Sequence, residues 1–226
     1  MSQIVTKPKY ISNIYNCKVI DITHLTDTTF QITFERPDFK FTSGQHIIIS
    51  LDGDLHDREY SICSSEEDLN MKILVKEVNG GYFTPLLKLV KKGDYLKIRG
   101  PHGRFCIDYE NSLNKEIILI ATGTGIAPFR SMFFSYPKLN FKIIHGIRYS
   151  NESYYRGEFK SKYLSCTSRE AGGDFKGRVT DYIKSIKFPD NSIFYLCGNF
   201  DMIYEVNNLL TSKGHNINSI FTEAYF

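Results

Sequence analysis

The chain has 226 residues, a length that suits one large domain or two modest ones. Hydrophobic residues make up 42%, charged residues 23% and the net charge is +3, which excludes a disordered, collagen-like or low-complexity protein. No apolar run approaches the roughly 20 residues that a spanning helix needs, so we expect no membrane span. Residues 1–16 lack the continuous apolar stretch of a secretory signal, and we expect a cytoplasmic protein.

The five cysteines are an odd number without a close pair. This spacing predicts neither a disulfide framework nor a metal or iron-sulfur cluster, and we expect most of them to be buried thiols. The small basic excess, without a basic stripe interleaved with aromatic residues, gives no support for nucleic-acid binding.

From residue 17 to about 108, short runs rich in β-branched and aromatic residues alternate with turn residues. Strands are expected at 30–34, 46–51, 59–63, 72–78 and 95–99, with one short helix at 84–90. Several strands at this spacing favour an antiparallel barrel, which we assign to residues 1–110.

Strands and helices alternate after residue 111. Strands are expected at 116–121, 141–147, 163–166, 192–197 and 219–223, and helices at 128–134, 152–162, 179–186 and 202–212. This pattern predicts an open, mostly parallel sheet covered by helices over residues 115–226. The polar stretch 109–115 is interpreted as a short linker.

The strongest local motif of the second half is Ala-Thr-Gly-Thr-Gly-Ile-Ala-Pro-Phe at 121–129, between an expected strand and an expected helix. Glycines let the backbone approach a phosphate, and N–H groups at a helix start attract its charge, so a pyrophosphate is the natural ligand. The motif matches neither a P-loop nor the usual three-glycine dinucleotide fingerprint. A tight strand-to-helix turn that binds nothing is the alternative.

A second motif, Arg58-Glu59-Tyr60-Ser61, begins an apolar run in the first half. Arginine offers a forked donor for a phosphate, tyrosine a flat face for a ring, and serine one hydroxyl for a ring nitrogen. Alone this is weak evidence, because a strand that alternates between core and solvent produces such a pattern often.

Taken together and in this order, the two motifs resemble the two-domain bacterial ferredoxin-NADP and flavodoxin-NADP reductases. Three further segments match that family in order: Asn-Gly-Gly-Tyr-Phe-Thr at 79–84, Gly-Pro-His-Gly-Arg-Phe at 100–105 and Cys-Gly-Asn-Phe-Asp-Met at 197–202. The resemblance implies an α+β two-domain protein with an N-terminal antiparallel six-stranded flavin-binding β-barrel. It also implies a C-terminal α/β parallel-sheet nucleotide-binding domain.

The same resemblance implies the cofactors FAD and NADP(H) and a set of residues for each role. Four residues are implied to be catalytic: Ser61, Cys197, Glu223 and Tyr225. The implied cofactor-binding residues are Arg58, Glu59, Tyr60, Ser61, Val75, Lys76, Gly81, Tyr82, Phe83, Thr84, Thr124, Gly125, Arg148, Ser168, Arg169, Arg178, Asp201, Met202, Tyr225 and Phe226. In the family a C-terminal aromatic lies over the isoalloxazine, which we assign to Tyr225, and a further aromatic covers the adenine, which we assign to Phe226. The choice of FAD over FMN rests on that second assignment.

The preference for NADP over NAD is argued from charge. The 2′-phosphate of NADP carries about two negative charges and needs fixed cations. Arg148, Arg169 and Arg178 stand in the contexts where arginines of the bacterial reductases hold this phosphate. Solvated surface arginines are the alternative.

The implied activity is reversible: hydride transfer from NADPH to FAD, followed by single-electron transfer to ferredoxin or flavodoxin as an acidic carrier. A basic stretch, formed by Lys88, Lys91, Lys92, Lys97 and Arg99, would steer such a carrier or would only solvate the surface. Two other interpretations stay open: a reductase that supplies an oxygenase component or free flavin, and a non-catalytic electron-transfer subunit. Residues 62–67 depart from the closest bacterial pattern, which leaves the subclass open.

Overall fold

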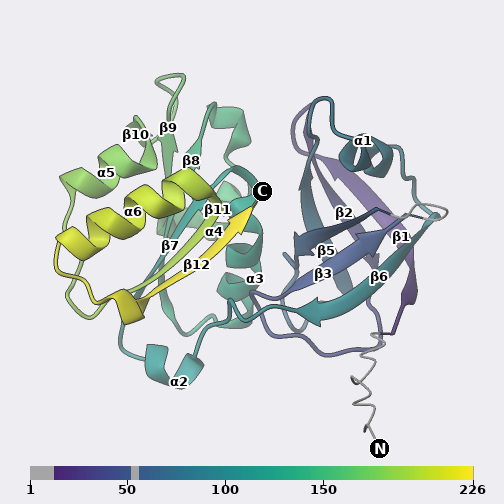
Figure 1. Ribbon diagram of the computed structural model, residues 1–226, viewed down its shortest axis with the longest axis horizontal. Helices are drawn as coiled ribbons and strands as arrows, with labels where there is room; N and C mark the ends of the chain where they lie inside the picture. The colour runs from purple at the N-terminus through teal and green to yellow at the C-terminus, as the bar shows by residue number, and fades with distance from the viewer. Residues whose placement is uncertain (1–12, 52–55, 226) are drawn as a thin grey trace, which may run out of the picture.

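The computed structural model describes residues 13–51 and 56–225, which form two halves that lie side by side (Figure 1). The N-terminal half is a six-stranded antiparallel sheet in the order β4-β3-β6-β1-β2-β5. Its elements are β1 (Tyr15–His24), β2 (Thr29–Glu35), β3 (His46–Ser50), β4 (Asp57–Ser61), β5 (Asn70–Lys76), α1 (Phe83–Lys88) and β6 (Tyr95–His102).

Alternating apolar residues hold β2 and β5 together. Phe30 and Ile32 of β2 stand opposite Val75 and Ile73 of β5, and all four side chains are fully buried. Because successive side chains of a strand point to opposite faces, every second residue reaches the core. The expectation of strands at 30–34 and around 72–78 is confirmed by this pairing.

The six-stranded antiparallel sheet expected from the sequence is confirmed, but its hydrogen bonding does not close it into a barrel. The edge strands β4 and β5 are linked across the gap by one isolated bridge, between Ile62 and Ile73, within the described residues. Away from this bridge a cavity separates the two strands, lined by Arg58 and Glu59 of β4 and by Lys76 of β5.

The C-terminal half is a six-stranded parallel sheet in the order β10-β9-β8-β7-β11-β12. Its strands are β7 (Glu116–Thr122), β8 (Asn140–Ile147), β9 (Tyr163–Thr167), β10 (Phe175–Lys176), β11 (Ile193–Asn199) and β12 (Ile220–Tyr225). The helices are α2 (Tyr109–Ser112), α3 (Ala127–Ser135), α4 (Arg156–Phe159), α5 (Val179–Ser185) and α6 (Phe200–Ser212). Short 3-10 helices span Gly123–Ile126, Ser150–Glu152, Lys160–Lys162 and Ile217–Ser219.

Strand β7 is buried on both faces, as its continuous apolar run predicts. Ile117 and Leu119 belong to the core beneath α3, whereas Ile118 and Ile120 belong to the core beneath α5 and α6. Helices on both sides of a parallel sheet exclude water from both faces, and the expected open parallel sheet is confirmed.

The single helix expected over 152–162 is wrong. The chain breaks there into separate turns because Tyr155 and Lys160 take left-handed conformations, with φ of 60° and 53°. The hydroxyl of Tyr155 donates to Gln31 Oε1 of the other half at 3.0 Å, and this contact draws the segment out of a regular helix. The 109–115 stretch contains the one-turn helix α2, and the division of the chain between residues 110 and 115 stays a prediction.

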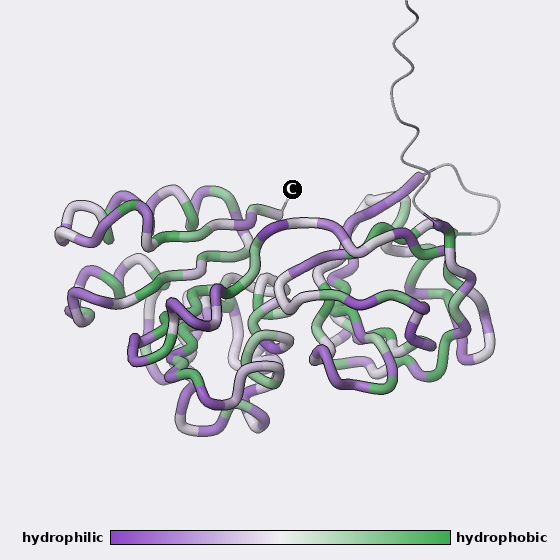
Figure 2. Tube along the Cα trace, turned by 90° about the horizontal axis from the view of Figure 1, so that it is seen from below, coloured by the Kyte–Doolittle hydropathy of each residue, from purple (hydrophilic) through white to green (hydrophobic). Residues whose placement is uncertain are grey.

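Polar and apolar contacts join the two halves. Ser43 of the first half meets Ser131 and Ser135 of α3 at 2.9 and 2.6 Å, and the buried Arg130 donates to the Cys63 carbonyl at 2.8 Å. Apolar stretches run along the strands of both halves, while the connecting loops are largely hydrophilic (Figure 2). The seam is therefore a fixed surface against which side chains from both halves can be positioned.

None of the helices in the described part of the chain combines the length and the apolar character needed to cross a membrane.

Candidate active site

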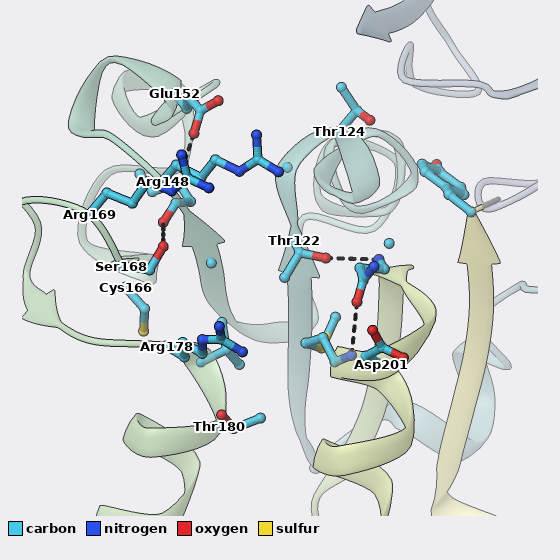
Figure 3. Close-up of a pocket in the computed structure, with 18 of the residues that line it drawn as sticks. Thr122, Thr124, Arg148, Glu152, Cys166, Ser168, Arg169, Arg178, Thr180 and Asp201 are labelled. Carbon is cyan, nitrogen blue, oxygen red and sulfur yellow. Dashed lines mark hydrogen bonds between the residues drawn. The ribbon is translucent and has the colours of Figure 1, made fainter. Parts of the chain in front are cut away.

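A cavity of about 540 Å³ opens at the carboxyl ends of β7, β8, β9 and β11 (Figure 3). In open parallel sheets, ligands bind at this edge, where the strand order reverses on either side of the first strand. Nine residues predicted to bind a cofactor line it: Lys76, Thr124, Arg148, Ser168, Arg169, Arg178, Asp201, Met202 and Tyr225.

The glycine motif forms the floor of this cavity. Gly123 takes a left-handed φ of 53° where β7 turns into the 3-10 helix that leads to α3. Gly125 lies beneath the lining, where a Cβ atom would stand 2.4 Å from the Cys197 carbonyl oxygen. Gly125 thus permits close packing of the turn against β11, and Thr124 is the motif residue that faces both the cavity and the seam.

The three predicted arginines point their side chains into or around the cavity from the ends of β8 and β9 and the start of α5 (Figure 3). All three side chains are exposed, and none is paired with a carboxylate among residues 13–51 and 56–225. Their backbones are fixed: the N–H of Arg169 donates to the Arg148 carbonyl at 3.0 Å, and that of Arg178 donates to Asp181 Oδ2 at 3.0 Å. Unpaired guanidinium groups on a fixed backbone suit a phosphate.

A second cavity, of about 1100 Å³, lies between β4 and the end of β5. The predicted residues that line it are Arg58, Glu59, Tyr60, Ser61, Lys76, Thr84, Thr124, Arg148, Glu223 and Tyr225. It offers the planar ring of Tyr60, the Arg58 guanidinium and hydroxyl groups, a donor set that fits a flavin and its phosphates.

Four of the cofactor-binding residues predicted in the N-terminal half line neither cavity. Val75 and Phe83 are buried in the barrel-like core, and Tyr82 is 58% exposed with its ring against His56. Gly81 lies in the turn that contacts Val78. Phe226 is outside the described residues.

Three of the four predicted catalytic residues form a hydrogen-bonded cluster at the seam. The Tyr225 hydroxyl donates to Ser61 Oγ at 2.7 Å, and Ser61 Oγ donates to Glu223 Oε1 at 2.9 Å. Burial raises the pKa of Glu223 above its ordinary value, and nearby Glu59 adds to the rise, against the opposing Ser61 hydrogen bond. Burial also raises the pKa of Tyr225 well above its ordinary value.

Cys197 is the fourth of these residues and lies behind the cluster. Its side chain is fully buried, and burial raises the pKa of its thiol well above the ordinary value. A buried thiol with a raised pKa is a poor nucleophile, which agrees with the prediction that Cys197 serves as a small packing contact.

The two cavities meet, because five residues line both: Lys76, Thr124, Arg148, Glu152 and Tyr225. A ligand in the first cavity and a ligand in the second would therefore come together beside Tyr225. Lys76 comes from β5 of the N-terminal half, whereas Arg148 and Glu152 follow β8 of the C-terminal half.

Several lining residues were not among those predicted from the sequence: Thr26, Asp27, Thr28, His46, Thr122, Tyr149, Asn151, Glu152 and Asn199. Thr122 and Asn199 lie within the motifs at 121–129 and 197–202, but no local motif marks the others, which reach the cavities only in the packed structure. Asn199 also caps α6 by accepting from the Met202 N–H at 3.2 Å, and an asparagine before a helix is a recognisable signal.

Comparison with known proteins agrees with this arrangement. The family model for the oxidoreductase FAD-binding domain matches residues 16–107, and that for the oxidoreductase NAD-binding domain matches residues 119–208. The ferredoxin–NADP reductase of Pseudomonas aeruginosa is 29% identical, with 92% of this chain and 93% of the relative covered. The flavodoxin/ferredoxin–NADP reductase of Rhodobacter capsulatus is 30% identical, with 87% and 85% covered.

One relative is named for a different role, and one solved structure bears on the fold. The electron transfer component of toluate 1,2-dioxygenase from Pseudomonas putida is 23% identical, with 93% of this chain and 67% of the relative covered. The crystal structure of a ferredoxin NADP+ reductase from Neisseria gonorrhoeae superposes with a TM-score of 0.86 at 19% identity, covering 94% of this chain and 99% of that one. On the two family models and these relatives, the chain belongs to the ferredoxin/flavodoxin–NADP reductases, a family of flavin-dependent oxidoreductase enzymes.

Proposed function

We propose that this protein takes a hydride from NADPH onto bound FAD and passes electrons singly to ferredoxin or flavodoxin, in either direction. The observation that carries the proposal is the meeting of the two cavities beside Ser61, Glu223 and Tyr225. One cavity presents unpaired arginines for a nucleotide, and the other presents an aromatic ring and hydroxyls for a flavin. FAD, when bound, supplies a ring system that accepts a hydride and releases electrons one at a time.

The second cavity supports flavin binding through β4. Arg58 would hold a phosphate with its forked donors, and Tyr60 would pack against the ring or its side chain. Burial raises the pKa of Tyr60, which keeps its hydroxyl neutral. Of the remaining predicted residues, Thr84 lines the cavity and also accepts the Val78 N–H at 2.8 Å, which fixes the turn after β5.

The first cavity supports NADP(H) binding. Arg148, Arg169 and Arg178 would hold the 2′-phosphate, and Thr124 would face the pyrophosphate from the glycine turn. The Ser168 hydroxyl donates to the Ile147 carbonyl at 3.2 Å. This bond joins the chain just before Arg169 to the chain just before Arg148.

At the seam, the residues of the chain would orient the reacting rings and control protons. Tyr225 closes the space in which a nicotinamide would stack, so this side chain must move aside when the nucleotide enters. Ser61 Oγ is held between Tyr225 and Glu223, and it can receive a proton at that oxygen as it passes one to the carboxylate. The raised pKa of Glu223 makes this carboxylate a better proton acceptor than an ordinary glutamate.

The basic stretch expected to steer an acidic electron carrier is partly neutralised. Lys88 is paired with Glu77 at 2.6 Å and Arg99 with Asp57, which lowers the positive potential of the basic stretch expected to steer an acidic partner. The similarity to a dioxygenase electron transfer component favours a second candidate, in which the acceptor is an oxygenase. A non-catalytic electron-transfer subunit is disfavoured by the unpaired arginines of the first cavity. A cytoplasmic location stays a prediction from the sequence.

The test begins with the purified protein and its visible spectrum. We expect a yellow flavin spectrum that bleaches anaerobically with NADPH faster than with NADH, because three cations face the first cavity. Equal rates with both nucleotides would contradict the NADP assignment, and a colourless protein that takes up no flavin would contradict the whole proposal. Adding ferredoxin, flavodoxin or an oxygenase component to the reduced protein then separates the two candidate acceptors. A reduced protein that gives electrons to none of them would favour a different acceptor class.

A further inference from the structure

Glu152 is a carboxylate at the seam that no motif singled out. It is 9% exposed and lines both cavities. Its Oε1 accepts from Lys76 Nζ at 2.9 Å, and its Oε2 accepts from the backbone N–H groups of Arg148 at 2.8 Å and Tyr149 at 3.3 Å. One side chain thus holds a cation from the N-terminal half and the arginine segment from the C-terminal half.

The hydrogen-bond donors around Glu152 favour its charged form. Burial by itself would raise the pKa of Glu152, but Lys76 and the two backbone N–H groups outweigh it, and the pKa lies below the ordinary value. When a buried carboxylate that accepts three hydrogen bonds is removed, its three donors are left without a partner. Removal would therefore free both Lys76 and the backbone at Arg148.

Neighbouring contacts fix the same segment from its other side. Arg169 donates its N–H to the Arg148 carbonyl, and Glu170 accepts from the N–H and hydroxyl of Ser150. The backbone of Arg148 is thereby held at both polar groups: its N–H donates to Glu152, and its carbonyl accepts from the Arg169 N–H. Of these anchors, Glu152 alone reaches across the seam to Lys76.

We propose that Glu152 is a positioning residue for nucleotide selection: it ties the Arg148 backbone to Lys76 and so sets where the Arg148 guanidinium meets the 2′-phosphate. The inference rests on the proposed function, since it presumes that the first cavity takes NADP(H). It adds a residue whose two carboxylate oxygens are already bonded to Lys76 and to the backbone of the Arg148 segment, and which therefore acts by positioning them.

The test compares Glu152→Gln and Glu152→Ala in the flavin-loaded protein. Binding of NADP+ and of NAD+ to the oxidised protein is measured by calorimetry, which does not depend on turnover. We expect Glu152→Ala to weaken NADP+ binding about tenfold while NAD+ binding changes less than about twofold. Glu152→Gln keeps an oxygen that accepts the Arg148 N–H, so we expect a value between those of Glu152→Ala and the unmodified protein.

Glu158→Gln is the matched control. Glu158 pairs with Arg130 at 2.7 Å, and it lines neither cavity. We expect this variant to lose thermal stability without changing the ratio of NADP+ to NAD+ affinity. If Glu152→Ala loses stability in the same way and leaves that ratio unchanged, Glu152 is only a structural residue and the inference is wrong.

The proposed function and this inference fail differently. If the unmodified protein binds NADP+ no better than NAD+, the assignment of the arginines fails and the inference fails with it. If the unmodified protein prefers NADP+ and both Glu152 variants keep that preference, the inference alone is overturned.

Discussion

The hydroxyl of Tyr225 donates to Ser61 Oγ at 2.7 Å, which joins the last described residue of the chain to the end of β4. The two residues are 164 positions apart and belong to different halves. Strand β12 places Tyr225 there because it pairs in parallel with β11, with Tyr225 opposite Asn199. The C-terminal strand therefore closes the seam at the point where both cavities meet.

Removing the Tyr225 ring should open this point to a nicotinamide. We expect Tyr225→Ala to tighten NADP+ and NAD+ binding by about threefold to tenfold, because an entering ring no longer displaces an aromatic contact. The preference for NADP+ should fall as the nicotinamide contribution grows. Binding titrations of the oxidised protein measure both effects, with the exposed Tyr204→Ala on α6 as a control. Unchanged affinity for both nucleotides would show that Tyr225 does not cover the nicotinamide position.

Each of the three cavity arginines should matter for NADPH and not for NADH. We expect Arg148→Ala, Arg169→Ala and Arg178→Ala each to lower kcat/KM for NADPH about tenfold, because a charge-assisted bond to a phosphate is lost. Steady-state rates with both nucleotides and a dye acceptor measure the change. Arg104→Ala, at an exposed position outside both cavities, is the control. A parallel loss with NADH would mean that these arginines support folding instead.

The raised pKa of Glu223 predicts how stability depends on pH. A carboxyl whose pKa is higher in the folded state than its ordinary value of 4.5 stabilises the fold fully below pH 4.5. That contribution amounts to about 1.4 kcal/mol for each unit by which the folded-state pKa exceeds the ordinary one. It is lost as the pH rises through the folded-state pKa. Glu223→Gln stays neutral, so its unfolding free energy should match the unmodified protein near pH 4 and exceed it at pH 7.

Thermal or urea unfolding between pH 4 and pH 8 measures this difference. Glu67→Gln, at an exposed position, tests the effect of removing one charge without burial. If the free energies of unfolding of Glu223→Gln and of the unmodified protein differ by the same amount at every pH, ionisation of Glu223 does not destabilise the fold.

The packing of the glycine turn can be tested by a matched pair of alanine substitutions. At Gly125 a Cβ atom would stand 2.4 Å from the Cys197 carbonyl oxygen, whereas at Gly157 no heavy atom lies within 4 Å. We expect Gly125→Ala to lower the free energy of unfolding by about 3 kcal/mol and to weaken nucleotide binding, because the turn must move away from β11. Gly157→Ala, in α4, should change stability by less than about 1 kcal/mol. Equal unfolding midpoints for the two variants would contradict the close contact.

Much of the fold can be predicted from local sequence. The run at 116–121 predicts a strand buried on both faces, and β7 is such a strand, since each of its faces lies under helices. The alternation at 30–34 predicts β2 for the same reason of hydrophobic burial. The prediction of one helix over 152–162 was wrong, because the contact of Tyr155 with Gln31 of the other half outweighs local helix propensity.

The sequence by itself determined most of the strands and helices, although not β1 and β10, as well as the glycine turn after β7 and the family, because each of these depends on residues close together in the chain. Only the tertiary structure decided that Glu152 joins Lys76 to the Arg148 segment and that Tyr225 meets Ser61. The contact of Glu152 with Lys76 joins residues 76 positions apart and that of Tyr225 with Ser61 joins residues 164 positions apart, and nothing in local spacing encodes them. They exist because the two sheets pack along one seam, which brings their edges within hydrogen-bonding distance.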